Sequence, residues 1–149
     1  MIVSVTELTL ALREMLRSNG EAVQSLARRM GLGATDVTAI DHIISEPGGL
    51  GPGELASRLG IRSASATALV DRLEAAGHVR RVPHPSDRRR QTVIATDHAA
   101  EEVRSALSPL LREIEAVANR LTPAEAAATA RFLREVAAVM RAYADDATR

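Results

Sequence analysis

Residues 51–96 read GPGELASRLGIRSASATALVDRLEAAGHVRRVPHPSDRRRQTVIAT, and this stretch decides the fold. It contains two short segments with the apolar spacing of helices, followed by two short segments typical of β-strands. An arginine-rich turn separates the two strand segments. Two helices joined by a tight turn and followed by a basic hairpin predict a winged helix-turn-helix.

The second helix of this motif is predicted from Ser63 to Ala76, with Ser63 as its N-cap. Its apolar residues are spaced to face the core, so the opposite face carries small and hydroxyl-bearing side chains. Small residues allow a helix to enter the major groove of DNA closely, and hydroxyls can donate to phosphates or base edges. The alternative is an alanine-rich helix in solvent. The DNA contacts predicted for this recognition helix are Arg62, Ser63, Ser65, Thr67, Ala68 and Arg72.

The hairpin is predicted from two strands, at residues 78–82 and 91–95, and its turn forms the wing. The turn carries Asp87, Arg88, Arg89 and Arg90 in succession. Guanidinium groups on a thin ribbon can reach the minor groove and sense its negative potential. We expect Asp87 to orient one of them through a bidentate ion pair. The segment from Asp87 to Arg90 is therefore the second predicted DNA contact.

The charge of the chain is distributed unevenly. The net charge is zero, with 19 basic and 19 acidic residues, and every basic residue is an arginine. Residues 58–90 contain eight arginines against Asp71, Glu74 and Asp87, which gives +5, so the remainder of the chain carries −5. A basic segment in an otherwise acidic chain indicates a local site for a polyanion.

Several classes of function have no support in the composition. The chain has no cysteine, which excludes disulfides, a thiol redox sensor and cysteine-ligated metals. Its four histidines are scattered along the sequence without a helical His–His pair, so we expect no metal site and no cofactor. No phosphate-binding loop or nucleophile motif indicates an enzyme. No apolar run is long enough to span a membrane, and no signal peptide is evident, so a cytoplasmic location is expected.

The remaining sequence predicts four further helices. The first follows a capping box at Ser4 and Glu7, and the second is expected to begin at Thr35. The fifth contains Pro109, which should kink or break it near residue 108, and the sixth follows a second capping box at Thr122. The predicted fold is mainly α (α+β), with six helices. The first helix lies in residues 1–32, the winged helix-turn-helix in residues 33–96 and the last two helices in residues 97–149.

The order of these elements resembles the MarR family of bacterial transcriptional regulators. The resemblance rests on GELASRLGIRSASATALVDRLEAAGHVRR followed by PSDRRR and a strand. It implies an N-terminal dimerisation helix in residues 1–32, a DNA-binding lobe in residues 33–96 and C-terminal dimerisation helices in residues 97–149. The implied homodimer binds a pseudo-palindromic operator in double-stranded DNA, with Arg89 in the minor groove and Asp87 aiming it. It also implies a repressor that is released by a small aromatic or amphipathic ligand, in a crevice where Met15, His42 and Ile43 are the candidate contacts. The chain departs from the family pattern at Gly51, where threonine is common, and at Ala99, where glycine is common.

A second function is compatible with a winged helix. Such domains also serve as protein–protein interaction modules that never contact DNA. The three arginines of the turn disfavour this alternative, because a protein partner would need a matching acidic patch. The sequence thus predicts a DNA-binding regulator and names neither its operator nor its ligand.

Overall fold

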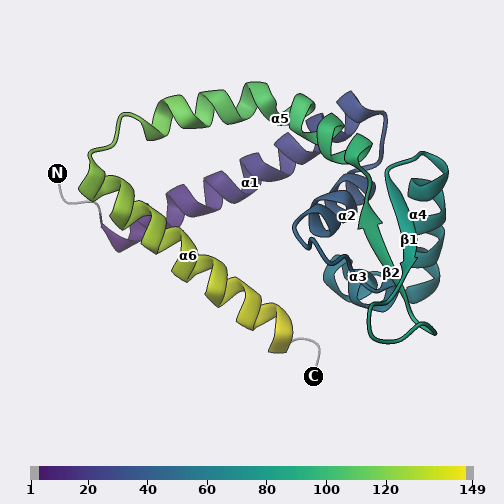
Figure 1. Ribbon diagram of the computed structural model, residues 1–149. Coiled ribbons are helices and arrows are strands. Elements are labelled where there is room, and N and C mark those ends of the chain that lie inside the picture. The colour runs from purple at the N-terminus through teal and green to yellow at the C-terminus, as the bar shows by residue number, and fades with distance from the viewer. Residues whose placement is uncertain (1–3, 147–149) are drawn as a thin grey trace. The chain divides into compact units, whose positions relative to one another are not determined.

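A computed structural model of the chain describes residues 4–146 (Figure 1). The elements are α1 (Val5–Met30), α2 (Ala34–Ile44), α3 (Pro52–Leu59), α4 (Ser63–Ala75), β1 (Val79–Pro83), β2 (Gln91–Ala95), α5 (Asp97–Ala118) and α6 (Pro123–Asp146). The predicted fold class, six helices with a two-stranded wing, is confirmed. The chain divides into two compact units, residues 1–107 and residues 108–149. The three-part division made from the sequence stays a prediction.

An aliphatic core fills the first unit. Helices α2, α3 and α4 gather around the β1–β2 hairpin (Figure 1), and α5 contributes its first turn through Ala99. A smaller cluster joins the C-terminal end of α1 to α2 through Leu26, Ala27 and Val37. Because apolar burial stabilises in proportion to area, these residues hold the helix-turn-helix in place. The buried members of the main core are Ala39, Ile40, Ile43, Leu50, Leu55, Leu69, Val70, Leu73, Val79, Val93 and Ala99.

The helix ends follow local chemistry, with two corrections to the predicted caps. Gly31 and Gly60 end α1 and α3 in the left-handed conformation, as the sequence predicts. The N-cap of α2 is Gly33 and not Thr35. The turn after α1 ends at Leu32, whose N–H donates to the Ala27 carbonyl at 2.9 Å, and α2 begins two residues later. The N-cap of α4 is the extended Arg62 and not Ser63, and it makes no side-chain capping bond.

The wing is an antiparallel pair that runs from Val79 opposite Ala95 to Pro83 opposite Gln91. The predicted first strand begins one residue later than expected, since His78 precedes β1 and is buried. Leu50 forms a one-residue bridge with Val93, and the two residues exchange backbone hydrogen bonds of 2.9 and 2.8 Å. This bridge attaches the hairpin to the loop before α3.

Helices α5 and α6 begin with the predicted caps. The Thr96 hydroxyl accepts the Ala99 N–H at 3.2 Å and donates to the Gly77 carbonyl at 2.7 Å. Thr122 and Glu125 form the second capping box. Of the kink or break predicted near residue 108, the break is wrong, because α5 is one helix through Pro109, and the kink stays a prediction. Proline removes one helical hydrogen bond, and the remaining turns of a 22-residue helix are enough to carry the helix past it.

Large apolar side chains are exposed on α1, α5, α6 and the turn between the last two. None of the helices in residues 4–146 is long and apolar enough to cross a membrane. Exposed apolar surface of this extent on a folded chain marks an interaction site. The exposed residues are Val5, Leu8, Leu10, Met15 and Leu16 on α1, Leu110, Leu111, Ile114 and Val117 on α5, Leu121 in the turn, and Leu133, Val139, Met140 and Tyr143 on α6.

Candidate nucleic-acid interface

Helix α4 separates its core face cleanly from its outer face. Leu69, Val70 and Leu73 are at most 2% exposed. The predicted contacts Arg62, Ser63, Ser65, Thr67 and Ala68 are all exposed and lie on the N-terminal half of the helix or directly before it. The exposed side of this half of α4 thus carries small side chains, with Arg62 directly before it.

The N-terminus of α4 differs from that of every other helix in residues 4–146. Each of the other five helices has an acidic residue in its first turn, whereas α4 has none. It also lacks a side-chain cap, so its first N–H groups have no partner from a capping side chain. The positive end of the helix dipole and these N–H groups favour an anion such as a phosphate. The preceding Arg62 adds a full positive charge at the same point.

Arg72 is engaged within the protein. Its guanidinium donates to both carboxylate oxygens of Asp36 on α2, at 2.6 and 3.2 Å. The hydrogen bond to Asp36, with the charge of that carboxylate, raises the pKa of Arg72. The Asp36 side chain is only 8% exposed, so the pair joins a buried carboxylate to the edge of α4. We infer that Arg72 positions the recognition helix.

The eight arginines of residues 58–90 fall into two groups. Arg58 pairs with Glu46 and Glu54, Arg72 pairs with Asp36, and Arg81 pairs with Asp71 and Glu74. Three of the eight are therefore neutralised locally. The side chains of the other five make no ion pair or hydrogen bond within residues 4–146, and all five residues are exposed. They are Arg62, Arg80, Arg88, Arg89 and Arg90.

Asp87 shapes the turn of the wing and does not clamp a guanidinium. Its carboxylate accepts the backbone N–H of Arg89 at 3.0 Å, and its carbonyl accepts the N–H of Arg90 at 2.9 Å. The expected bidentate pair with an arginine is not seen in the part of the chain that the structure describes. An aspartate that bonds its own backbone two residues later is the usual way this residue type closes a tight turn. Asp87 therefore fixes the backbone that presents the three wing arginines.

Arg80 belongs to this surface, although it was not among the contacts predicted from the sequence. It follows Val79, which is 2% exposed, so alternation along β1 turns Arg80 outward. The alternation of apolar Val79 and charged Arg80 before the wing could have indicated from the sequence that Arg80 is exposed.

Comparison with known proteins identifies the family. A sequence model of the MarR family matches residues 30–90. An uncharacterised HTH-type transcriptional regulator, YcgE of Bacillus subtilis, is 33% identical over 117 residues, which cover 78% of this chain and 75% of YcgE. The chain belongs to the MarR family of transcriptional regulators.

Solved structures agree with this MarR-family assignment. The transcriptional regulator Tm0710 of Thermotoga maritima superposes with a TM-score of 0.67 at 26% identity, covering 93% of this chain and 96% of Tm0710. A point mutant of MepR from S. aureus, bound to an oligodeoxyribonucleotide, has a TM-score of 0.60 at 13% identity, covering 89% of this chain and 97% of MepR. At that identity the second likeness concerns the fold alone.

The predicted ligand contacts do not share a described cleft. Ile43 is 1% exposed and belongs to the core, Met15 is exposed on α1, and His42 is half-buried on α2. A cleft of about 580 Å³ is lined by Arg29, Met30, His98, Glu101, Glu102, Ser105 and Ala106. A second, of about 390 Å³, is lined by Gly20, Val23, Gln24, Ala34, Thr35, Thr38, Arg58 and Leu59. The ligand site named from the sequence stays a prediction.

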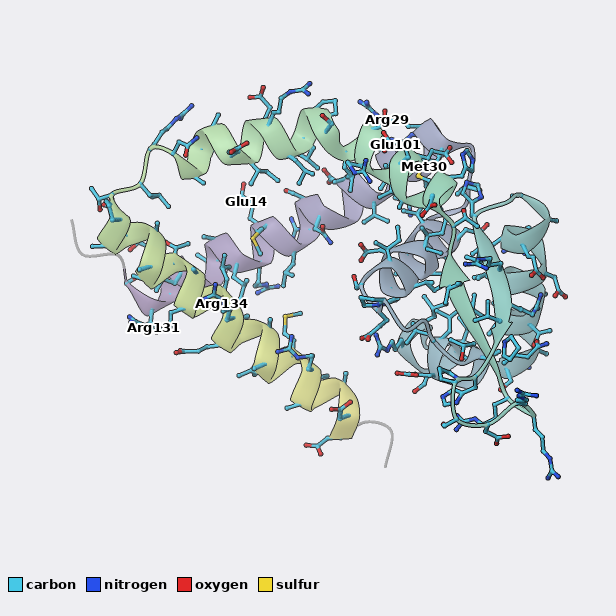
Figure 2. All side chains as sticks on the ribbon, viewed as in Figure 1. Glu14, Arg29, Met30, Glu101, Arg131 and Arg134 are labelled. Atoms are coloured by element: carbon cyan, nitrogen blue, oxygen red, sulfur yellow. The ribbon has the colours of Figure 1, made fainter. Side chains whose placement is uncertain are left out.

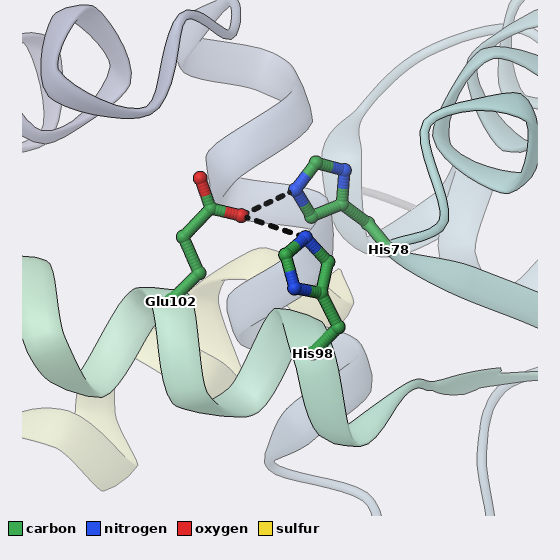
Figure 3. A group of neighbouring side chains, drawn as sticks. All are labelled: His78, His98 and Glu102. Carbon is green, nitrogen blue, oxygen red and sulfur yellow. Dashed lines mark hydrogen bonds and ion pairs between the residues drawn. The ribbon is translucent and has the colours of Figure 1, made fainter.

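The fold brings together three side chains of metal-ligating types, and the sequence did not predict that they would be neighbours. His78, His98 and Glu102 each offer one ligand atom, and these atoms lie within 4.8 Å of one another (Figure 3). No metal site was expected, because the four histidines include no helical His–His pair and the chain has no cysteine. The i, i+4 spacing of His98 and Glu102 could have indicated from the sequence that these two side chains share a helix face. Only the fold brings His78 close to them.

Proposed function

We propose that this MarR-family regulator binds double-stranded DNA, with α4 in the major groove and the wing from Asp87 to Arg90 at the minor groove. The observation that carries the proposal is the set of five exposed arginines without an internal partner, which flank the small-residue face of α4 and form the wing. Guanidinium groups already paired with carboxylates would have to break those pairs to contact phosphate. These five can contact it without that cost.

The exposed apolar residues of α1, α5 and α6 support a homodimer. An isolated chain would expose them to water, and a second copy would cover them. In this proposal, two copies related by a two-fold axis would hold their recognition helices about 34 Å apart, the spacing of half-sites in a pseudo-palindromic operator. The structural likeness to MepR, whose mutant was solved with an oligodeoxyribonucleotide, is consistent with this use of the fold.

In this proposal the regulator acts in the cytoplasm as a repressor that blocks access to a promoter. A small aromatic or amphipathic ligand would favour a dimer whose helix spacing no longer matches the operator, and so lower its affinity for DNA. The scarcity of aromatic residues, 1% of the chain, favours an aliphatic binding surface for that ligand. Among the sequence-predicted residues, Met15 and His42 are accessible to it.

The test compares two variants that lose the same charge. Arg89→Ala removes an arginine of the wing, and Arg104→Ala removes one of α5 that pairs with Glu101. Binding to a duplex from the protein's own upstream region is measured by fluorescence anisotropy over a range of salt concentrations. We expect Arg89→Ala to weaken binding about tenfold and to reduce the slope of log K against log salt by about 0.9, the value for one phosphate contact.

Arg104→Ala should leave that slope unchanged. If both variants had the same duplex affinity and the same salt dependence, the proposed contact between the wing and DNA would be refuted. If the wild type fails to bind this duplex or a pool of random duplexes at low salt, the DNA-binding proposal fails and a protein-interaction module takes its place.

A further inference from the structure

We propose that His78, His98 and Glu102 form a binding site for a divalent transition-metal ion of the Zn²⁺ type, which ties the end of the recognition helix to α5. The three residues come from two places in the fold. His78 follows the turn that ends α4, and His98 and Glu102 lie one turn apart on α5 (Figure 3). All three belong to the first compact unit.

The three ligand atoms lie close together. The Glu102 Oε2 atom lies 2.7 Å from His78 Nε2 and 3.5 Å from His98 Nε2, and no two of the three ligand atoms are more than 4.8 Å apart. In a tetrahedral zinc site with bonds of about 2.0–2.2 Å, neighbouring ligand atoms are about 3.3 Å apart. The two separations from Glu102 lie on either side of this value, so modest side-chain shifts would create the coordination geometry.

The exposure of the three side chains shows which of them can make that adjustment. The His78 side chain is 7% exposed and is held by the core, whereas those of His98 and Glu102 are 65% and 31% exposed. The site is therefore partly preformed, because His78 is held in place while His98 and Glu102 can adjust their side chains. The spacing of His98 and Glu102 places both on the same face of α5.

The buried position of His78 leaves Nε2 as its one polar contact. Its Nδ1 atom is buried and has no hydrogen-bond partner within the described residues, and Nε2 bonds Glu102. A buried imidazole with half of its polar capacity unused costs more than an aliphatic side chain of similar size. A metal ion at Nε2 would replace the hydrogen bond to Glu102 by a stronger bond, and it would leave Nδ1 unpaired.

The cleft of about 580 Å³ gives the site access to solvent. It is lined by His98 and Glu102 together with Arg29, Met30, Glu101, Ser105 and Ala106. Arg29 and Glu101 line it where the end of α1 meets the first turns of α5 (Figure 2), and Glu101 is paired with Arg104. Three protein ligands beside an open cleft leave a fourth position for water.

Two imidazoles and one carboxylate select among the divalent ions. Imidazole suits zinc, copper, iron and nickel, whereas magnesium and calcium prefer sites made wholly of oxygen ligands. Zn²⁺ is therefore the ion used as the probe. Co²⁺ serves as its spectroscopic substitute, because a tetrahedral site with nitrogen ligands gives it visible absorption.

The location of the site suggests a regulatory role, and this step rests on the DNA-binding function proposed above. His78 is already joined to the start of α5, because its carbonyl accepts the Thr96 N–H at 3.0 Å. A metal ion would add a side-chain link between the same two segments and restrict the motion of the C-terminal end of α4. A helix that is already ordered loses less conformational freedom when it binds DNA.

The first arm of the test measures metal binding without DNA. Zn²⁺ affinity is determined by competition with a chromophoric chelator for the wild type, His98→Ala and Glu102→Gln, with His84→Ala as the control that removes a histidine outside the cluster. We expect a single Zn²⁺ per chain, and a loss of at least about tenfold in affinity for His98→Ala and Glu102→Gln, since even outer-shell changes cost about 10–100-fold. His84→Ala should bind as the wild type does, and Mg²⁺ should not compete.

Equal Zn²⁺ affinity of the wild type and His98→Ala would overturn the site. Both replaced side chains are exposed or half-buried, so these variants should keep their fold, which circular dichroism checks. Visible absorption of the Co²⁺ form that is lost in His98→Ala would identify the imidazole as a ligand.

The second arm measures operator affinity with and without saturating Zn²⁺. We expect Zn²⁺ to tighten binding of the wild type about fivefold or more, within the usual range of allosteric coupling, and to leave His98→Ala unaffected. An unchanged or weakened affinity would refute the regulatory role and leave the metal site intact. Absence of DNA binding in both conditions would refute the proposed function instead, so the two failures are distinguishable.

Discussion

The pair between Asp36 and Arg72 leads to a prediction whose size depends on which partner is removed. Both oxygens of Asp36 accept from the guanidinium, at 2.6 and 3.2 Å. The carboxylate side chain is 8% exposed and the arginine side chain 59% exposed. Loss of Arg72 would leave the buried Asp36 carboxylate without its partner, whereas loss of Asp36 would leave a guanidinium that water can solvate.

The magnitude follows from that asymmetry. Leaving a buried polar group without its partner costs about 1–3 kcal/mol, and more for a charge, so Arg72→Ala should lower the free energy of unfolding by about 2 kcal/mol. Asp36→Ala removes the charge together with its need for a partner and should cost about 1 kcal/mol or less, including the weaker interaction with the α2 dipole. The double variant should be more stable than Arg72→Ala alone, because it no longer contains the stranded carboxylate.

Urea unfolding of the three variants and the wild type, followed by circular dichroism at neutral pH and one protein concentration, measures these differences. The concentration is held constant because the stability of a dimer depends on it. The reasoning is refuted if Asp36→Ala costs as much as Arg72→Ala, or if the second substitution in the double variant destabilises further. Loss of operator affinity in Asp36→Ala, where Arg72 is still present, would show that this arginine positions α4.

Two further predictions concern the wing and the last helix. Gly49 has a φ of 77°, and a Cβ there would lie 2.4 Å from the Val93 carbonyl oxygen, so Gly49→Ala should lower the free energy of unfolding by about 2–4 kcal/mol. Gly48→Ala is the matched control in urea unfolding and should change it by less than about 1 kcal/mol, because a Cβ at Gly48 meets nothing within 4 Å. The backbone and hydroxyl hydrogen bonds from Thr122 lower the pKa of Glu125 below its ordinary 4.5, so its capping contribution is present above that pH and is lost as the pH falls through the lowered pKa. Thermal unfolding should accordingly show Glu125→Gln less stable than the wild type at neutral pH, with the difference shrinking in acid, and an equal difference at both pH values would contradict this account.

The sequence by itself determined the features that depend on nearby residues. Both capping boxes and the glycines that end α1 and α3 follow from patterns of a few residues. The recognition-helix face was also readable, because helical spacing alone separates the core side of α4 from its outer side. At the caps predicted at Thr35 and Ser63, the error was two residues and one residue.

Only the tertiary structure decided which charged side chains are paired within the protein and which are free to contact a ligand. Asp36 and Arg72 are separated by 36 residues, and His78 and Glu102 by 24, so no local pattern could connect them. Ion pairs and metal sites depend on atoms that approach within a few ångströms, and the packing of α2 against α4, or of α5 against the start of the wing, sets that approach. For this reason the sequence could not show that Arg72, a predicted DNA contact, is paired with Asp36, that Arg80 is exposed and unpaired, or that His78 and His98 lie beside Glu102.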